Sequence, residues 1–144
     1  MNITTLVVAS FAILAEVCLC QPASQAVIAN LAEVKWSHET SDPPGSESVP
    51  LREDTAIGAL DLLVRYPPGH VFPPHWHGAN ERIILLEGRL SLRQGDTEKF
   101  LDPGGFAYLP AREVQRLSCV SKTRCTFYVY WDGKPGSHAA AGAK

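Results

Sequence analysis

Two histidines and a glutamate near the middle of the chain are the residues best suited to chemistry. They are His75, His77 and Glu81, and the segment that carries them lies between Gly69 and Gly88. Side chains two residues apart on a β-strand point to the same face, and Glu81 keeps that parity if the chain stays extended or returns after a tight turn. Two neutral imidazoles and one carboxylate on one face form a set that binds a divalent transition metal and leaves positions open. The alternative is a metal-free pocket in which Glu81 hydrogen-bonds one imidazole.

Short extended segments separated by turn signals surround this group and must position it. Pro73 and Pro74 favour an extended approach to the histidines and exclude a helix there. Many strands of this length, joined by Gly- and Pro-rich turns, predict an all-β sandwich or small barrel. The expected strands are an edge strand over 33–36 and further strands over 59–66, 82–86, 89–93, 99–101, 106–109, 114–120 and 126–131.

The N-terminus differs in composition from the rest of the chain. Residues 3–20 are almost wholly apolar, although Glu16 interrupts them, and we expect residues 1–20 to be a signal peptide with cleavage as late as residue 26. The alternatives are a buried N-terminal element or an uncleaved anchor. This interpretation predicts a secreted or periplasmic protein that has no membrane segment once the signal is removed. We expect an N-terminal arm and loop over 21–54, one β domain over 55–132 and a flexible tail over 133–144.

Length and charge narrow the possible functions. The chain has 144 residues, enough for one domain with a proper core, and its formal net charge is −2. A charge this small gives no reason to expect a nucleic acid or an anionic membrane as partner. Cys119 and Cys125 could form a disulfide at the base of a hairpin in an oxidising compartment, or could be two small buried residues.

The spacing of these residues resembles the sequence motifs of the cupin superfamily. Residues 69–88 match the first motif, G-x5-H-x-H-x3-E-x6-G, position for position, and residues 104–110 match the opening of the second, roughly G-x5-P-x-G-x2-H-x3-N. Arg112, Gln115 and Cys119 then stand where the second motif has glycine, histidine and asparagine. The resemblance implies an all-β fold with a single jelly-roll β-barrel (an antiparallel double-sheet sandwich), and a homodimer built through edge strands.

The resemblance also implies a ligand set for the metal. His75, His77 and Glu81 would bind Fe, Mn, Ni or Zn, and Gln115 would be either a weak amide ligand or a partner that holds a metal-bound water. Arg112 could clamp a carboxylate at the rim of the site, or could form a surface ion pair with Glu113 or Glu87.

Other side chains near the motifs are assigned by parity. Trp76 should pack on the outer face of its strand. Phe106 and Tyr108 share a face and are expected in the core, although Tyr108 could present its hydroxyl to the pocket. Three further histidines lack a partner pattern and are expected to be exposed, namely His38, His70 and His138.

Three functions are compatible with this sequence. The first is a metal-dependent enzyme of the oxygenase, isomerase or lyase type that acts on a small organic acid or phenolic, with Arg112, Tyr108 and Glu113 as candidate catalytic residues. The second is a binding or sensing module for a small molecule, with a weakened or absent metal site. The third is a purely structural periplasmic domain. One fold hosts many chemistries, so the fold alone does not choose among them.

Overall fold

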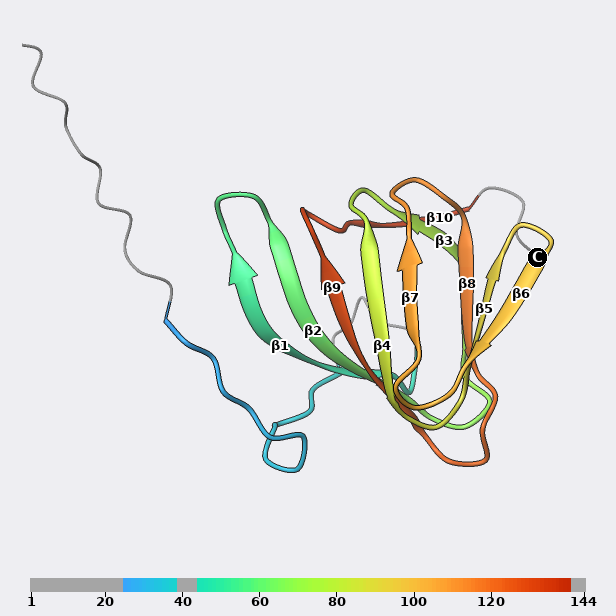
Figure 1. Cartoon of the computed structure of the whole chain (residues 1–144), viewed down its shortest axis with the longest axis horizontal. Helices are drawn as coiled ribbons and strands as arrows, with labels where there is room; N and C mark the ends of the chain where they lie inside the picture. The colour runs from blue at the N-terminus through green and yellow to red at the C-terminus, as the bar shows by residue number, and fades with distance from the viewer. Residues whose placement is uncertain (1–24, 39–43, 141–144) are drawn as a thin grey trace, which may run out of the picture.

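The computed structural model describes residues 25–38 and 44–140, which form an all-β structure without a helix. Figure 1 shows the strands in two layers. The strands of these residues are β1 (Glu47–Asp54), β2 (Ala59–Tyr66), β3 (Val71–His77), β4 (Glu81–Glu87), β5 (Leu90–Gln94), β6 (Thr97–Leu101), β7 (Phe106–Leu109), β8 (Gln115–Cys119), β9 (Cys125–Trp131) and β10 (Ser137–Ala139).

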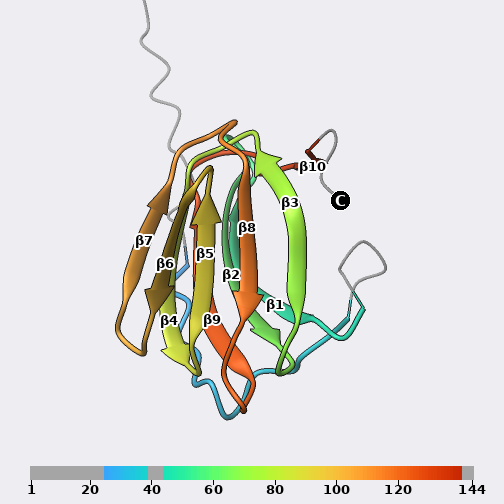
Figure 2. The ribbon, with the colours of Figure 1, turned by 90° about the vertical axis from the view of Figure 1, so that its right-hand side faces the viewer.

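The strands form two antiparallel sheets that pack face to face. One sheet has the order β1-β2-β9-β4-β7, and the other has the order β10-β3-β8-β5-β6. Figure 2 looks onto the second sheet, with strands of the first sheet behind it. No ladder joins the two sheets within the described residues. The predicted all-β double-sheet sandwich is therefore confirmed, whereas the sheets do not close into a barrel.

Period-2 alternation of apolar side chains builds the core between the sheets. On β4, Ile83 and Leu85 are 0% exposed, while Ile84 between them is 39% exposed. On the neighbouring β9, Phe127 and Val129 are 1% exposed and face the same core. Because successive side chains of a strand point to opposite faces, this pattern fixes which face of each strand is turned inward.

The arm and loop expected over 21–54 are wrong for their last eight residues, which form β1. This strand pairs with β2 along its length. Arg65 of β2 donates two hydrogen bonds to the Glu47 carboxylate, from Nε to Oε2 at 2.5 Å and from Nη2 to Oε1 at 2.9 Å. An edge strand needs few apolar side chains, because its ladder and cross-strand charge pairs hold it in place. A polar sequence was therefore compatible with a strand.

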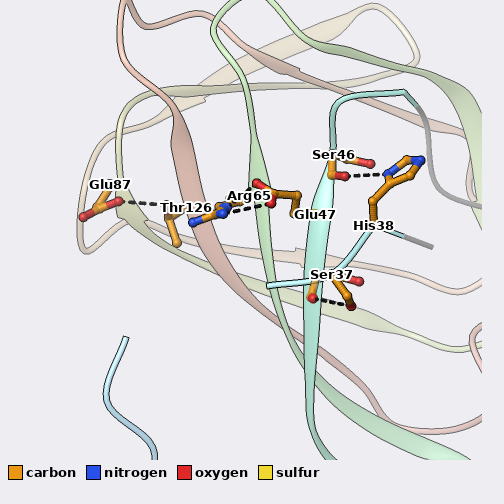
Figure 3. A network of polar contacts seen from close by, with 8 residues as sticks. Ser37, His38, Ser46, Glu47, Arg65, Glu87 and Thr126 are labelled. Atoms are coloured by element: carbon orange, nitrogen blue, oxygen red, sulfur yellow. Dashed lines mark hydrogen bonds and ion pairs between the residues drawn. The ribbon is translucent and has the colours of Figure 1, made fainter. Parts of the chain in front are cut away.

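The segment before β1 is tied to the sheet, although the edge strand expected over 33–36 does not form. A single antiparallel bridge joins Ser37 to Ser48. The Ser37 hydroxyl donates to the Ser48 carbonyl oxygen at 3.2 Å, and His38 Nδ1 lies 2.8 Å from the Ser46 carbonyl oxygen. Figure 3 shows these contacts beside the Glu47–Arg65 pair, together with the hydrogen bond that Thr126 donates to Glu87.

The C-terminal tail expected to be flexible contains a strand. Residues Ser137–Ala139 form β10, which pairs with β3 in the register Ser137 to His77 and Ala139 to His75. The tail is therefore docked on the strand that carries both motif histidines. Residues 141–144 lie outside the described residues.

Cys119 and Cys125 form a disulfide, which confirms one of the two alternatives for this pair. Their Cα atoms lie 5.7 Å apart, and both residues are buried. The expected signal peptide lies in residues 1–24, outside the described residues. In the described part of the chain, no helix has the length and apolar character needed to cross a membrane.

We predict that removing the disulfide with Cys119→Ser and Cys125→Ser together lowers the free energy of unfolding by about 2 kcal/mol, since the bond closes a short loop in the unfolded chain. Urea titrations of the wild type and the double variant, each with and without reductant, measure this change. Reductant should shift only the wild type. A wild type that is insensitive to reductant would contradict the assignment.

Candidate metal centre

Three strands bring the predicted site residues together between the sheets. His75 and His77 lie on β3, Glu81 opens β4, and Gln115 opens β8 directly opposite His75. All four side chains are buried, and Glu81 is only 4% exposed. The sequence motif is thus assembled from both sheets at one end of the sandwich.

A local irregularity in β3 gives the histidines their orientation. The ladder between β3 and β8 shifts register between Phe72 and His75, where Pro73 and Pro74 lie. Proline has no amide hydrogen to donate to the ladder, so it is tolerated at such a bulge. After the bulge, both imidazoles point inward, whereas Trp76 between them faces away and stacks on His138 with ring centroids 3.9 Å apart.

Backbone carbonyls fix the tautomer of both imidazoles. His75 Nδ1 lies 2.8 Å from the Pro73 carbonyl oxygen, and His77 Nδ1 lies 2.9 Å from the Gly136 carbonyl oxygen. A carbonyl oxygen can only accept, so each Nδ1 carries the hydrogen and each neutral ring has a lone pair on Nε2. The two Nε2 atoms face each other at 3.1 Å. Two lone pairs at this distance repel unless a proton or a cation lies between them.

The Glu81 carboxylate completes the cluster. Its Oε2 lies 3.7 Å from His77 Nε2 and accepts a hydrogen bond from the amide nitrogen of Gln115. This bond requires the amide oxygen of Gln115 to point away from the carboxylate, because two facing oxygens would repel. In this arrangement Gln115 orients Glu81.

Burial disfavours the charged form of all three side chains in the cluster. It raises the pKa of Glu81 to about 7 and lowers the pKa of His75 to about 4, and it also lowers the pKa of His77. In each case removal from water disfavours the charged form more than the neighbouring hydrogen bonds favour it. A carboxylate and two neutral imidazoles in such a place are the donor set that a divalent cation would compensate.

The donor set fits a transition metal ion in chemistry and spacing. Two ligands that each lie about 2.1 Å from one ion, at a right angle, are about 3.0 Å apart, close to the Nε2–Nε2 separation. The Glu81 oxygen is somewhat farther away, and in the described residues no group of three His, Cys, Asp or Glu side chains is arranged as a finished metal site.

A hydrogen-bonded set of loops supports the end of β3. Asp132 accepts two hydrogen bonds from Asn80, from the backbone nitrogen at 3.0 Å and from the amide side chain at 2.9 Å. The Asn80 side-chain oxygen accepts from the Ala111 backbone nitrogen at 3.0 Å. The bonds from Asn80 and the neighbouring Arg82 lower the pKa of Asp132. These contacts hold the turn between His77 and Glu81 against the loops that follow β7 and β9.

A cavity of about 1060 Å³ opens from the cluster of His75, His77 and Glu81 between the two sheets. The carboxylate of Glu81 and both imidazoles line one part of it, and residues in or next to β1, β2, β3, β8, β9 and β10 supply the rest of the wall. Its apolar wall includes Leu62, Val64, Phe72, Leu117, Phe127 and Val129.

His70 is partly buried, although its sequence context led us to expect an exposed side chain. It lines the cavity, and its ring lies 4.4 Å from that of Tyr66. Its Nε2 and the Nε1 of Trp131 are buried without a hydrogen-bond partner in the described structure. Trp131 also lines the cavity, beside His77 at 5.3 Å between ring centroids. The expectation of exposure holds for His38 and His138.

The candidate catalytic residues Arg112, Tyr108 and Glu113 lie elsewhere. None of them belongs to the cavity wall, and all three are exposed. The expectation that Phe106 and Tyr108 are core residues is wrong, since they are 59% and 49% exposed. The guanidinium carbon of Arg82 lies 5.4 Å from the centroid of the exposed Tyr108 ring. Within the described residues Arg112 forms no ion pair with Glu113 or Glu87.

Comparison with known proteins identifies the family. The family model described as the ChrR cupin-like domain matches residues 24–132. The chain is a member of this cupin family. No curated protein sequence matches it.

Solved cupin structures share the fold. The polyketide cyclase RemF from Streptomyces resistomycificus is 19% identical with a TM-score of 0.67, and the match covers 83% of this chain and 89% of RemF. The cupin domain of Schizosaccharomyces pombe Cnp3 is 14% identical with a TM-score of 0.65, over 76% of this chain and 70% of that one. An oxalate oxidase is 22% identical with a TM-score of 0.62, over 84% of this chain and 69% of the oxidase.

The second cupin motif has a glycine where this chain has Arg112, and the backbone there shows why. Arg112 has a φ of 65°, in the left-handed region that glycine adopts readily. This conformation lets the Arg112 backbone nitrogen donate to the His77 carbonyl oxygen at 2.8 Å. The loop after β7 therefore needs the left-handed turn to support β3, whichever side chain stands at the position.

We predict that Arg112→Gly raises the free energy of unfolding by about 0.5 kcal/mol, because relief of about 1–2 kcal/mol of backbone strain outweighs about 0.5–1 kcal/mol of added chain entropy. Urea titration measures the change. The matched control is Arg116→Gly, at an exposed position within β8, where glycine should lower stability by about 0.5–1 kcal/mol. Equal losses in both variants would refute the strain at Arg112.

Proposed function

We propose that this cupin binds a divalent transition metal ion, Fe, Mn, Ni or Zn, through His75, His77 and Glu81 and acts as a metal-dependent enzyme on a small organic acid or phenolic. Gln115 holds the Glu81 carboxylate in this proposal. The oxygenase, isomerase and lyase reaction types fit a site with three protein ligands and open positions. The alternative is a cupin that binds or senses a small molecule without converting it.

One observation carries the proposal. The Nδ1 hydrogens of both imidazoles are committed to backbone carbonyls, so two unprotonated Nε2 atoms face each other at 3.1 Å in a buried place. A metal-free pocket would leave this repulsion in place, or would need a proton that the lowered pKa values of both rings disfavour. A cation bound by both lone pairs removes it.

The residues around the cluster have distinct tasks in this proposal. The carbonyls of Pro73 and Gly136 orient the imidazoles, and such outer partners also increase the basicity of the ligand nitrogens. Gln115 orients Glu81 through its amide hydrogen. A bound ion would supply Lewis-acid chemistry at a substrate oxygen. The apolar wall of the cavity excludes water and holds the body of the substrate beside the cluster.

The names of the structural relatives support an enzyme without deciding it. A polyketide cyclase and an oxalate oxidase have this fold, whereas the Cnp3 structure is described only as a cupin domain. The Cys119–Cys125 disulfide supports our further proposal that the protein is exported to the periplasm or secreted, because disulfides persist in oxidising compartments. A homodimer built through edge strands is also part of the proposal.

We predict that the protein, purified without chelator or a nickel column, contains close to one equivalent of transition metal by elemental analysis. The variant His75→Ala/His77→Ala should lose it, because it lacks two of the three ligands. The matched control is His38→Ala/His138→Ala, which removes two exposed histidines and should keep the metal. A metal-free wild type, even after incubation with each candidate ion, would leave only the metal-free binding function.

We predict that the metal-loaded protein consumes at least one compound from a panel of phenols and small organic acids, with products followed by mass spectrometry. Glu81→Gln should reduce the rate at least 100-fold, because an amide is a much weaker ligand than a carboxylate. Binding of a panel member by both proteins without any conversion would contradict the enzyme and favour the alternative.

A further inference from the structure

The composition of the cavity wall bears on which molecule the site accepts. Among the described residues that line the cavity, Glu81 is the only Asp, Glu, Lys or Arg. The sequence outside the described residues contains a single cation, Lys144. Away from the cluster, the described residues that line the cavity are apolar and aromatic side chains together with serines, prolines and His70.

A charged group placed against this wall would lose its hydration without gaining a partner. Transfer of an unpaired carboxylate from water to an apolar site is strongly unfavourable, so such a molecule would bind poorly. Among the described wall residues away from the cluster, the polar side chains are uncharged, His70 included because burial lowers its pKa, so an anionic group finds a charged partner only at the proposed metal ion. An apolar body, in contrast, gains affinity in proportion to the apolar surface that it buries.

The size and shape of the cavity fit a molecule of this kind. At about 1060 Å³, it is at the upper end of the range for sites that take drug-sized ligands. Rings of Tyr66, Phe72 and Trp131 line it and offer flat surfaces for an aromatic body. The uncharged Nε1–H of Trp131, buried without a partner, is the kind of group that an uncharged ligand oxygen satisfies.

We infer that the cavity receives a largely apolar, aromatic molecule with one polar or acidic group, which faces His75, His77 and Glu81, and that it rejects molecules charged at a second position. This inference rests on the proposed metal centre for the placement of the polar group, and it narrows the proposed substrates to phenolics and monoacids with a ring body. Small organic acids with two carboxylates are excluded.

The test uses three probes with the same naphthalene body: naphthalene-2-methanol, 2-naphthoate and naphthalene-2,6-dicarboxylate. Isothermal titration calorimetry measures their binding to the full chain, once stripped with chelator and once loaded with metal. In the stripped protein the alcohol should bind at least 10-fold more tightly than either acid. In the loaded protein the monoacid should gain affinity, and the diacid should stay at least 10-fold weaker than the monoacid.

The inference would be overturned if the loaded protein gained affinity for the monoacid but bound the diacid equally well, or if no probe bound at millimolar concentration. Failure of the metal centre gives a different result, since each probe would then bind the loaded and the stripped protein with the same affinity, while the preference for the alcohol remained. Leu62→Trp, which fills part of the cavity, should weaken binding of the alcohol at least 10-fold. The control is Ile84→Trp on the outer face of the same sheet, which should leave binding of the alcohol unchanged. Equal weakening in both variants would show that the probe binds outside the cavity and would overturn the inference.

Discussion

The close approach of two imidazole nitrogens is the constraint on which the rest of the site depends. Nε2 of His75 and Nε2 of His77 are held 3.1 Å apart, in a buried place, by carbonyls that occupy the opposite nitrogen of each ring. Such a pair is unfavourable by itself, and its hydrogen-bonded frame has to maintain it. The frame combines a local and a distant part of the chain, since Pro73 precedes His75 by two residues and Gly136 follows His77 by 59.

This frame gives a role to features that would otherwise look incidental. Docking of β10 on β3 brings the Gly136 carbonyl to His77. The left-handed turn at Arg112 brings a backbone amide to the His77 carbonyl, and Asp132 holds Asn80 in the turn that leads to Glu81. Each of these contacts positions the end of β3. The same sandwich remains open as a cavity where β1 and β2 face β3 and β10, so the donor atoms of the cluster are reachable by a ligand.

The sequence predicted the structure correctly where alternation of apolar residues or a sequence motif determined it. The strands at Ala59–Tyr66 and Phe106–Leu109 have the predicted bounds, and the motif residues His75, His77, Glu81 and Gln115 do converge. Both errors at the ends of the fold concern edge strands. β1 and β10 are polar or small in composition and are held by cross-strand pairing that no local pattern reveals.

The surroundings of the site were harder to predict than its centre. Tyr108 was expected in the core, but β7 is an edge strand, and its outer face is open. His70 was expected to be exposed, because nothing near it in sequence indicates that it packs against Tyr66 on the cavity wall. The glycine of the second motif was the one signal for the left-handed turn at Arg112. Among the described residues, seven strands contribute to the cavity wall, and its lack of Lys and Arg becomes visible only when these strands are placed together.

The most direct test of the central claim is a crystal structure of the metal-supplemented protein, with anomalous diffraction recorded above and below the absorption edge of the metal. We predict one anomalous peak at the edge, within coordination distance of Nε2 of His75, Nε2 of His77 and a carboxylate oxygen of Glu81. We also expect both Nδ1 atoms to remain bonded to their carbonyls. The absence of a peak at this position from crystals grown with each candidate metal would contradict the metal centre.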